Sequence, residues 1–125
     1  MTAPGPGPDV LLVEDDAAIR ESLAECLELE GHPVWAVADG LAALAWLGEG
    51  NRPRVVVLDL VMPMMNGDEL VRELRAAPGT RDLPLVMMTG ASPGEVEGSQ
   101  VDALVIKPFE LAELLRVVRR LLGSR

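Results

Sequence analysis

Polar side chains that could take part in chemistry follow four of the five short apolar stretches in this sequence. Each lies directly after the end of its stretch. They are Glu14 and Asp15 after residues 10–13, Asp59 after 55–58, Thr89 after 85–88 and Lys107 after 103–106. A carboxylate beside a run of apolar residues, as at Asp59, is costly to bury unless something compensates it. Three carboxylates in one cleft would need a cation, and oxygen-only ligands suit Mg²⁺ better than zinc.

These residue types together could hold a tetrahedral anion against Asp59. Lys107 would add a positive charge opposite the metal, and Thr89 would add a hydroxyl donor. A carboxylate can be a nucleophile, and phosphoryl transfer mainly needs alignment and positive charge on the phosphoryl oxygens. The pattern therefore predicts phosphoryl transfer to Asp59.

Each of these residues also has a simpler structural interpretation. An acid after a strand often caps a helix, which is how we interpret Asp16, and Thr-Gly is often a turn. For Asp59 alone the structural and functional interpretations are about evenly balanced. The four groups together, at the ends of four stretches, favour function.

The elements that would position these residues can be read from the hydrophobic pattern. Apolar quartets occupy residues 10–13, 34–37, 55–58, 85–88 and 103–106. Continuous apolar strands are typical of a parallel sheet covered on both faces, because every side chain is then buried. The segments between them carry helical stripes, among them Ile19, Leu23 and Leu27, then Leu41, Leu44 and Leu47. The sequence predicts a single doubly wound α/β domain built from five βα units.

In such a fold the polar residues lie at the carboxyl edge of the sheet. Open parallel sheets bind ligands at this edge, in the crevice where the strand order reverses. If the first and third strands are neighbours there, Glu14, Asp15 and Asp59 meet in one small cleft.

Two segments depart from the alternation of strand and helix. Residues 3–8, APGPGP, predict a mobile tail, so we expect a flexible segment at 1–8, a folded domain at 9–122 and a C-terminal tail at 123–125. Residues 90–101, GASPGEVEGSQV, contain three glycines and one proline. This composition predicts that the fourth helix is short or disordered.

Length and charge restrict the class of protein. The 125 residues suit one domain of ordinary size, and the net charge of −9 argues against direct binding to nucleic acid or to anionic membranes. We expect a cytoplasmic protein, because no apolar run approaches the roughly 20 residues that span a bilayer and the start lacks the features of a secretory signal. Cys26 and His32 are each alone, so one chain cannot form a disulfide or a Cys/His zinc site.

Across residues 9–122 the sequence resembles the receiver domain of two-component response regulators. The resemblance rests on four motifs, which are LLVEDD, VVVLDLVMPMMNG, VMMTG and VIKPF. With it we expect a five-stranded parallel sheet of flavodoxin-like order 2-1-3-4-5. The resemblance also implies a cis peptide bond between Lys107 and Pro108, which is plausible only before proline.

The resemblance assigns a role to each acidic residue of the predicted cleft. It implies that Asp59 is the phosphoacceptor. It also implies that Mg²⁺ is bound by Glu14, Asp15, Asp59 and the backbone carbonyl of Val61.

The same resemblance implies phosphoryl contacts and a conformational switch. The contacts would come from Thr89, Lys107 and the backbone amides of Gly90 and of Leu60 or nearby residues. Gly90 suits this role on its own account, since a small residue lets the backbone approach a ligand. In the family, movement of the Thr hydroxyl is coupled to rotation of an aromatic ring, whose position matches Leu104 here. Leucine cannot make the hydroxyl contact of that ring, so we hypothesise that output passes through residues 90–101.

A second hypothesis concerns the lifetime of the acyl phosphate. In the family, the residues that orient the hydrolytic water match Val61 and Ala91. Neither side chain can hold water in line, which predicts slow self-dephosphorylation.

The leading functional hypothesis is a phosphoacceptor receiver, which takes a phosphoryl group from a histidine kinase or phosphotransfer protein and is read by an unknown downstream protein. We expect that the protein is not an enzyme, apart from catalysing its own phosphorylation and slow dephosphorylation on Asp59. The main alternative is a docking module that does not depend on phosphate, which Leu104 favours. A Mg²⁺-dependent phosphatase would need a second acid where Val61 stands, and a flavin carrier would need more aromatic residues. The chain ends just past the last expected helix, which fits either a stand-alone receiver or an excised domain.

Overall fold

The computed structural model describes residues 7–90 and 100–123. Strands and helices alternate along residues 7–90, and one further strand and helix follow in residues 100–123. The strands are β1 (Val10–Val13), β2 (Val34–Val37), β3 (Val55–Asp59), β4 (Leu85–Thr89) and β5 (Ala103–Ile106). The helices are α1 (Ala17–Leu29), α2 (Gly40–Gly48), α3 (Gly67–Ala76) and α4 (Leu111–Leu122).

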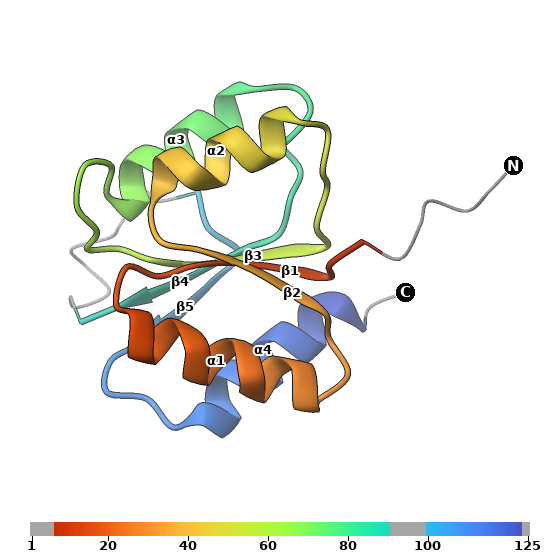
Figure 1. The fold of residues 1–125 in the computed structure, drawn as a ribbon, viewed down its shortest axis with the longest axis vertical. Helices are drawn as coiled ribbons and strands as arrows, with labels where there is room; N and C mark the ends of the chain where they lie inside the picture. The colour runs from red at the N-terminus through yellow and green to blue at the C-terminus, as the bar shows by residue number, and fades with distance from the viewer. Residues whose placement is uncertain (1–6, 91–99, 124–125) are drawn as a thin grey trace, which may run out of the picture.

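The five strands form one parallel sheet in the order β2-β1-β3-β4-β5. Helices α2 and α3 cover one face of this sheet, and α1 and α4 cover the other (Figure 1). The predicted doubly wound fold and its strand order are confirmed. The chain reverses direction across the sheet between β1 and β3, so these two strands lie side by side at the expected crevice.

Alternate residues of the central strands point to opposite faces, which gives the domain two apolar layers. Under α2 and α3 lie Leu11, Val13, Val56, Leu58 and Met87. Under α1 and α4 lie Val10, Leu12, Val55, Val57 and Met88. Because both faces are covered, β1, β3 and β4 are buried along their whole length, and this holds their carboxyl ends rigidly.

The expectation that all five quartets are buried is wrong for the two edge strands, β2 and β5. Only Val105 is buried in β5, and no residue is buried in β2. Trp35 of β2 is 47% exposed and stacks on Trp46 of α2, with 5.6 Å between ring centroids. Two residues of the predicted helical stripes, Ile19 and Leu41, are also exposed. They lie in the first turns of α1 and α2.

Side-chain caps fix the starts of α1, α2 and α3, whereas α4 has no side-chain cap hydrogen bond. Asp16 caps α1 by accepting a hydrogen bond from the amide of Ile19, as predicted. Asn66 caps α3 in a reciprocal arrangement with Glu69. These caps satisfy backbone donors that the first helical turn leaves without partners, and they set the length of the loops at the carboxyl edge.

Several sequence-based expectations lie outside the described residues. Residues 91–99 contain most of the segment expected to form a weak fourth helix and to carry the output. Residues 1–6 and 124–125 make up most of the two expected tails. No helix in the described ranges is long and apolar enough to cross a membrane.

Candidate functional site

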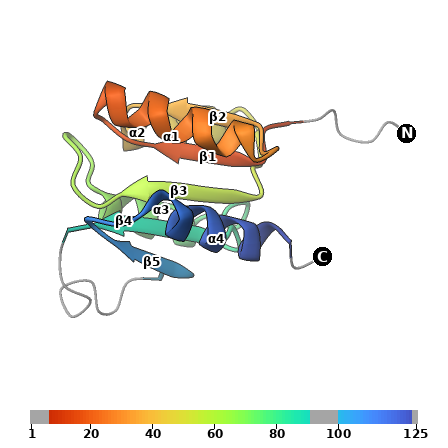
Figure 2. The same cartoon turned by 90° about the horizontal axis from the view of Figure 1, so that it is seen from below.

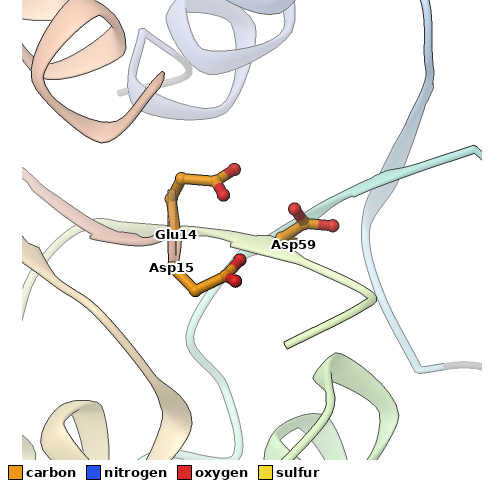
Figure 3. A group of neighbouring side chains, drawn as sticks. All are labelled: Glu14, Asp15 and Asp59. Atoms are coloured by element: carbon orange, nitrogen blue, oxygen red, sulfur yellow. The ribbon is translucent and has the colours of Figure 1, made fainter. Parts of the chain in front are cut away.

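Three carboxylates meet at the carboxyl edge of the sheet, as the sequence predicted. Glu14 and Asp15 follow β1 and Asp59 ends β3, and each offers a carboxylate oxygen that lies within 4.8 Å of the other two. Figure 3 shows the three side chains beside one another at the ends of these neighbouring strands. Glu14 and Asp59 are buried, whereas Asp15 is exposed, so the cluster is open to solvent on one side.

Both carboxylate oxygens of Asp59 have a partner. The Nζ atom of Lys107 lies 2.8 Å from Oδ2 of Asp59, and the amide of Val61 donates to Oδ1 at 3.2 Å. The amide of Leu60 is already used, because it donates to the carbonyl of Met88 in β4. Of the amides expected near the phosphoryl group, the one directed at Asp59 is therefore that of Val61.

Lys107 reaches Asp59 from the end of β5. The peptide bond between Lys107 and Pro108 is cis, which confirms that expectation. The amide of Lys107 also donates to the carbonyl of Thr89 at 2.7 Å, which ties the residue after β5 to the last residue of β4. The ammonium group balances part of the negative charge that three neighbouring carboxylates create.

Glu14 is the most constrained member of the cluster. Its Oε2 accepts a hydrogen bond from the amide of Asp16 at 3.0 Å, whereas its Oε1 is buried with no partner among the described residues. Burial raises the pKa of Glu14 from 4.5 to about 7, the Asp16 amide opposes this rise, and the neighbouring charge of Asp59 adds to it. A buried carboxylate oxygen without a hydrogen-bond partner, on a residue of a carboxylate cluster, fits a site for a hard divalent cation.

The remaining predicted residues lie around this cluster. Thr89 ends β4 and is almost fully buried, Gly90 follows it and is exposed, and a Cβ atom at Gly90 would meet nothing within 4 Å. Leu104 pairs with Met87 in the β4–β5 register and packs against the apolar layer under α2 and α3. The switch role of Thr89 and Leu104, and the carbonyl of Val61 as a ligand, stay predictions. Ala91 lies outside the described residues.

One residue that shapes the site was not identified from the sequence. A Cβ atom added to Gly67, the first residue of α3, would lie 2.6 Å from the carbonyl oxygen of Asp59. The amide of Gly67 donates to the carbonyl of Leu60 at 2.7 Å. The start of α3 therefore packs directly on the backbone of Asp59, and only glycine permits this approach. The one available signal was the Asn-Gly pair that ends the acceptor motif.

The fold and the site together define a class of regulatory protein. Residues 10–119 match the response regulator receiver domain, and the chain belongs to this family. Receiver domains of this kind act in two-component systems, where they interact with histidine kinases or phosphotransfer proteins, and they are regulatory rather than classical enzymes.

Individual relatives agree with this assignment. The chain is 39% identical over 117 residues to the response regulator MprA of Mycobacterium sp. (strain KMS), covering 90% of this chain and 50% of that protein. The chain thus spans about half the length of the curated relatives it matches.

Two solved structures are similar throughout the domain. The receiver domain of a signal transduction histidine kinase from Syntrophus aciditrophicus has a TM-score of 0.87 and 30% identity, covering 94% of this chain and 92% of that one. The response regulator TrrA from Thermotoga maritima, in complex with Mg²⁺-BeF, has a TM-score of 0.78 and 31% identity, covering 90% and 96%.

Proposed function

We propose that Asp59 accepts a phosphoryl group from a phosphohistidine donor, in the presence of Mg²⁺, and that a partner protein reads the change. One observation carries the proposal: a buried carboxylate at a strand end has a lysine ammonium 2.8 Å away and two further carboxylates within reach of one cation. Structural capping does not account for this set, because Asp59 ends a strand and caps no helix.

The acidic cluster would hold the cation. Glu14, Asp15 and Asp59 would supply carboxylate oxygens, and Val61 would supply its backbone carbonyl. When bound, Mg²⁺ would supply positive charge that stabilises the phosphoryl oxygens during transfer. The partnerless Oε1 of Glu14 supports this assignment, as does the similarity to a structure in complex with Mg²⁺-BeF.

The remaining residues would align and neutralise the phosphoryl group. An oxygen of Asp59 attacks phosphorus, and the bond from phosphorus to the imidazole nitrogen of the donor breaks with its electron pair on that nitrogen. The ring leaves as neutral histidine because its other nitrogen carries a proton. Lys107 then pairs with a phosphoryl oxygen in addition to Asp59. Thr89 donates its hydroxyl to a second oxygen, and the amide of Gly90 contributes a further donor.

Phosphorylation would move Thr89 and change the rotamer of Leu104, and the output would pass through residues 90–101. The downstream partner would be a protein, since the charge of −9 disfavours nucleic acid and anionic membrane. We expect the domain to act in the cytoplasm, where a histidine kinase or phosphotransfer protein would supply the phosphoryl group.

A docking module that works without phosphate is the second candidate. It is favoured by Leu104, which stands where the family switch has an aromatic ring and therefore cannot supply a ring hydroxyl. The complete set of acids and lysine argues against this candidate.

Phosphorylation with a small donor tests the proposal. We expect incubation with acetyl phosphate and Mg²⁺ to add one phosphoryl group, which peptide mapping should locate on Asp59. Asp82, an exposed acid in the loop before β4, should remain unmodified. Modification elsewhere, or none, would favour the docking module.

A further inference from the structure

We infer that Arg20 is a positioning residue of the proposed cation site, which holds the backbone that carries Glu14 and Asp15. The inference rests on the proposed function. Nη1 of Arg20 donates to the carbonyl of Glu14 at 2.9 Å and to the carbonyl of Asp15 at 3.4 Å. One guanidinium nitrogen in the first turn of α1 thus contacts the main chain of both residues.

The backbone of these two residues needs such support because it lies beyond the paired part of the sheet. The register of β1 with both of its neighbours ends at Val13. Glu14 retains one strand-like hydrogen bond, from its amide to the carbonyl of Val37, and the chain then turns into α1. The side chain of Arg20 bonds back across this turn from α1. The directions of the Glu14 and Asp15 side chains therefore depend on where the guanidinium holds the two carbonyls.

The contacts of Arg20 leave the carboxylates free. Among the described residues it bonds backbone carbonyls and forms no ion pair. A guanidinium that paired with Glu14 or Asp15 would compete with a metal for their oxygens. By charge alone, a cation close to a cation site weakens metal binding. Arg20 would therefore help this site by fixing the positions of the two carbonyls. Weaker Mg²⁺ binding after substitution of Arg20 would indicate this geometric effect, whereas tighter binding would indicate an effect of its charge.

Lysine is the conservative variant that isolates the geometry. It keeps the positive charge, but it lacks the rigid planar guanidinium that fixes donors in place. Outer residues that orient metal ligands typically contribute tenfold or more to metal affinity. We therefore expect Arg20→Lys to weaken Mg²⁺ binding by about tenfold. Arg20→Gln should also weaken it, although this variant removes a charge that repels the ion.

Arg54 is a matched control within the same chain. Its Nη2 donates to the carbonyl of Leu122 at 2.7 Å, and its Nη1 lies 3.7 Å from Asp9. Like Arg20 it ties a helix to the sheet through a carbonyl, but it precedes β3, at the edge from which the strands start and where α4 ends (Figure 2). Arg54→Lys should leave Mg²⁺ affinity unchanged.

Calorimetric titration of the whole chain with Mg²⁺ alone, at fixed ionic strength, tests the inference. Amide hydrogen exchange without metal provides a second measurement. In Arg20→Lys the Asp16 amide, which is bonded to the Glu14 carboxylate, should exchange faster, while the amides of β1 stay protected. Loss of protection throughout β1 would show that Arg20 only supports the fold, and would overturn the inference.

The outcomes separate this inference from the proposed function. Wild-type affinity in Arg20→Lys, or tighter binding in Arg20→Gln, would overturn the role of Arg20 while leaving the cation site intact. Absence of Mg²⁺ binding by the wild type, or equal binding by Asp59→Asn, would instead refute the site itself, and the role of Arg20 with it.

Discussion

The Nζ atom of Lys107 lies 2.8 Å from Oδ2 of Asp59, although 48 positions separate the two residues in the chain. Asp59 ends β3 and Lys107 follows β5, and these strands are not neighbours, because β4 lies between them. The hydrogen bond between the Lys107 amide and the carbonyl of Thr89 brings the start of the β5–α4 loop onto the end of β4. From there the lysine side chain crosses β4 and reaches the acidic cluster, so its charge is part of the site.

Replacing Lys107 with methionine should separate two effects of its charge. Loss of a cation removes repulsion of Mg²⁺, so we expect metal affinity to be unchanged or higher. Loss of the group that stabilises phosphoryl oxygens should slow phosphorylation of Asp59 by at least about tenfold. Calorimetry measures the first quantity, and the rate of modification by acetyl phosphate measures the second. Weaker Mg²⁺ binding with an unchanged rate would contradict this assignment.

The raised pKa of Glu14 predicts an unusual pH dependence for the metal-free protein. Between its ordinary value of 4.5 and the folded value of about 7, the folded state holds a proton that the unfolded chain has released. The contribution of Glu14 to the free energy of unfolding is therefore greatest below pH 4.5 and is lost as the pH rises through 7. We expect Glu14→Gln to be more stable than the wild type at pH 8, but not at pH 4. Denaturant unfolding across this range checks the difference, which should not vary with pH if Glu14 titrates normally.

The affinity for Mg²⁺ should rise with pH, whereas the contribution of Glu14 to the free energy of unfolding falls. Mg²⁺ needs the ionised carboxylate of Glu14, so its affinity should fall as the pH drops below about 7. Calorimetric titrations with Mg²⁺ between pH 6 and pH 8 measure this dependence. An affinity that is constant over this range would show that Glu14 is not a ligand or that its pKa is not raised.

Gly67→Ala should damage the site through the backbone. The added Cβ would lie 2.6 Å from the carbonyl oxygen of Asp59, and neither main-chain segment can shift without moving Asp59, the proposed phosphoacceptor. We expect a loss of about 1–3 kcal/mol in the free energy of unfolding and slower phosphorylation. Gly48→Ala is the control, because a Cβ there meets nothing within 4 Å. It should be neutral or stabilising by about 0.5–1 kcal/mol. Similar behaviour of the two variants would contradict the close approach.

Much of this architecture could be predicted from the sequence, because a parallel strand that is buried on both faces is apolar at every position. Residues 10–13 and 55–58 are apolar at every position, and the polar residues after them mark the carboxyl edge. The pattern was misleading at Trp35, since hydrophobicity does not reveal that a strand lies at the edge of a sheet. It was also misleading at Ile19 and Leu41, since periodicity cannot show how much of the first turn of a helix is covered by the rest of the domain.

Contacts that depend on the main chain could not be predicted. Arg20 has no neighbour in sequence that signals its bonds to the carbonyls of Glu14 and Asp15, and a helical arginine is usually solvated. Gly67 shows the same difficulty, because its role depends on how closely α3 approaches β3. In both cases the partner is a backbone carbonyl, which every residue carries and no sequence pattern marks.

Val61→Asn should shorten the lifetime of the acyl phosphate. The Val61 side chain is 74% exposed and cannot orient water, whereas an amide could hold a water molecule in line with the phosphorus atom. We expect the acyl phosphate to decay several-fold faster than in the wild type. This decay is measured as the loss of the added phosphoryl mass from the intact protein after the donor is removed. Met64→Asn is the control on the same loop, since Met64 is 78% exposed and its φ of 71° suits asparagine. Unchanged decay in Val61→Asn, or equal acceleration in both variants, would refute this explanation.

The most direct test of the central claim is the intact mass of the wild type and of Asp59→Asn after incubation with acetyl phosphate, each with Mg²⁺ and with a chelator. The account predicts one added phosphoryl group in the wild type with Mg²⁺, and none with the chelator or in Asp59→Asn. Equal modification of Asp59→Asn, or modification of the wild type that does not depend on Mg²⁺, would contradict it.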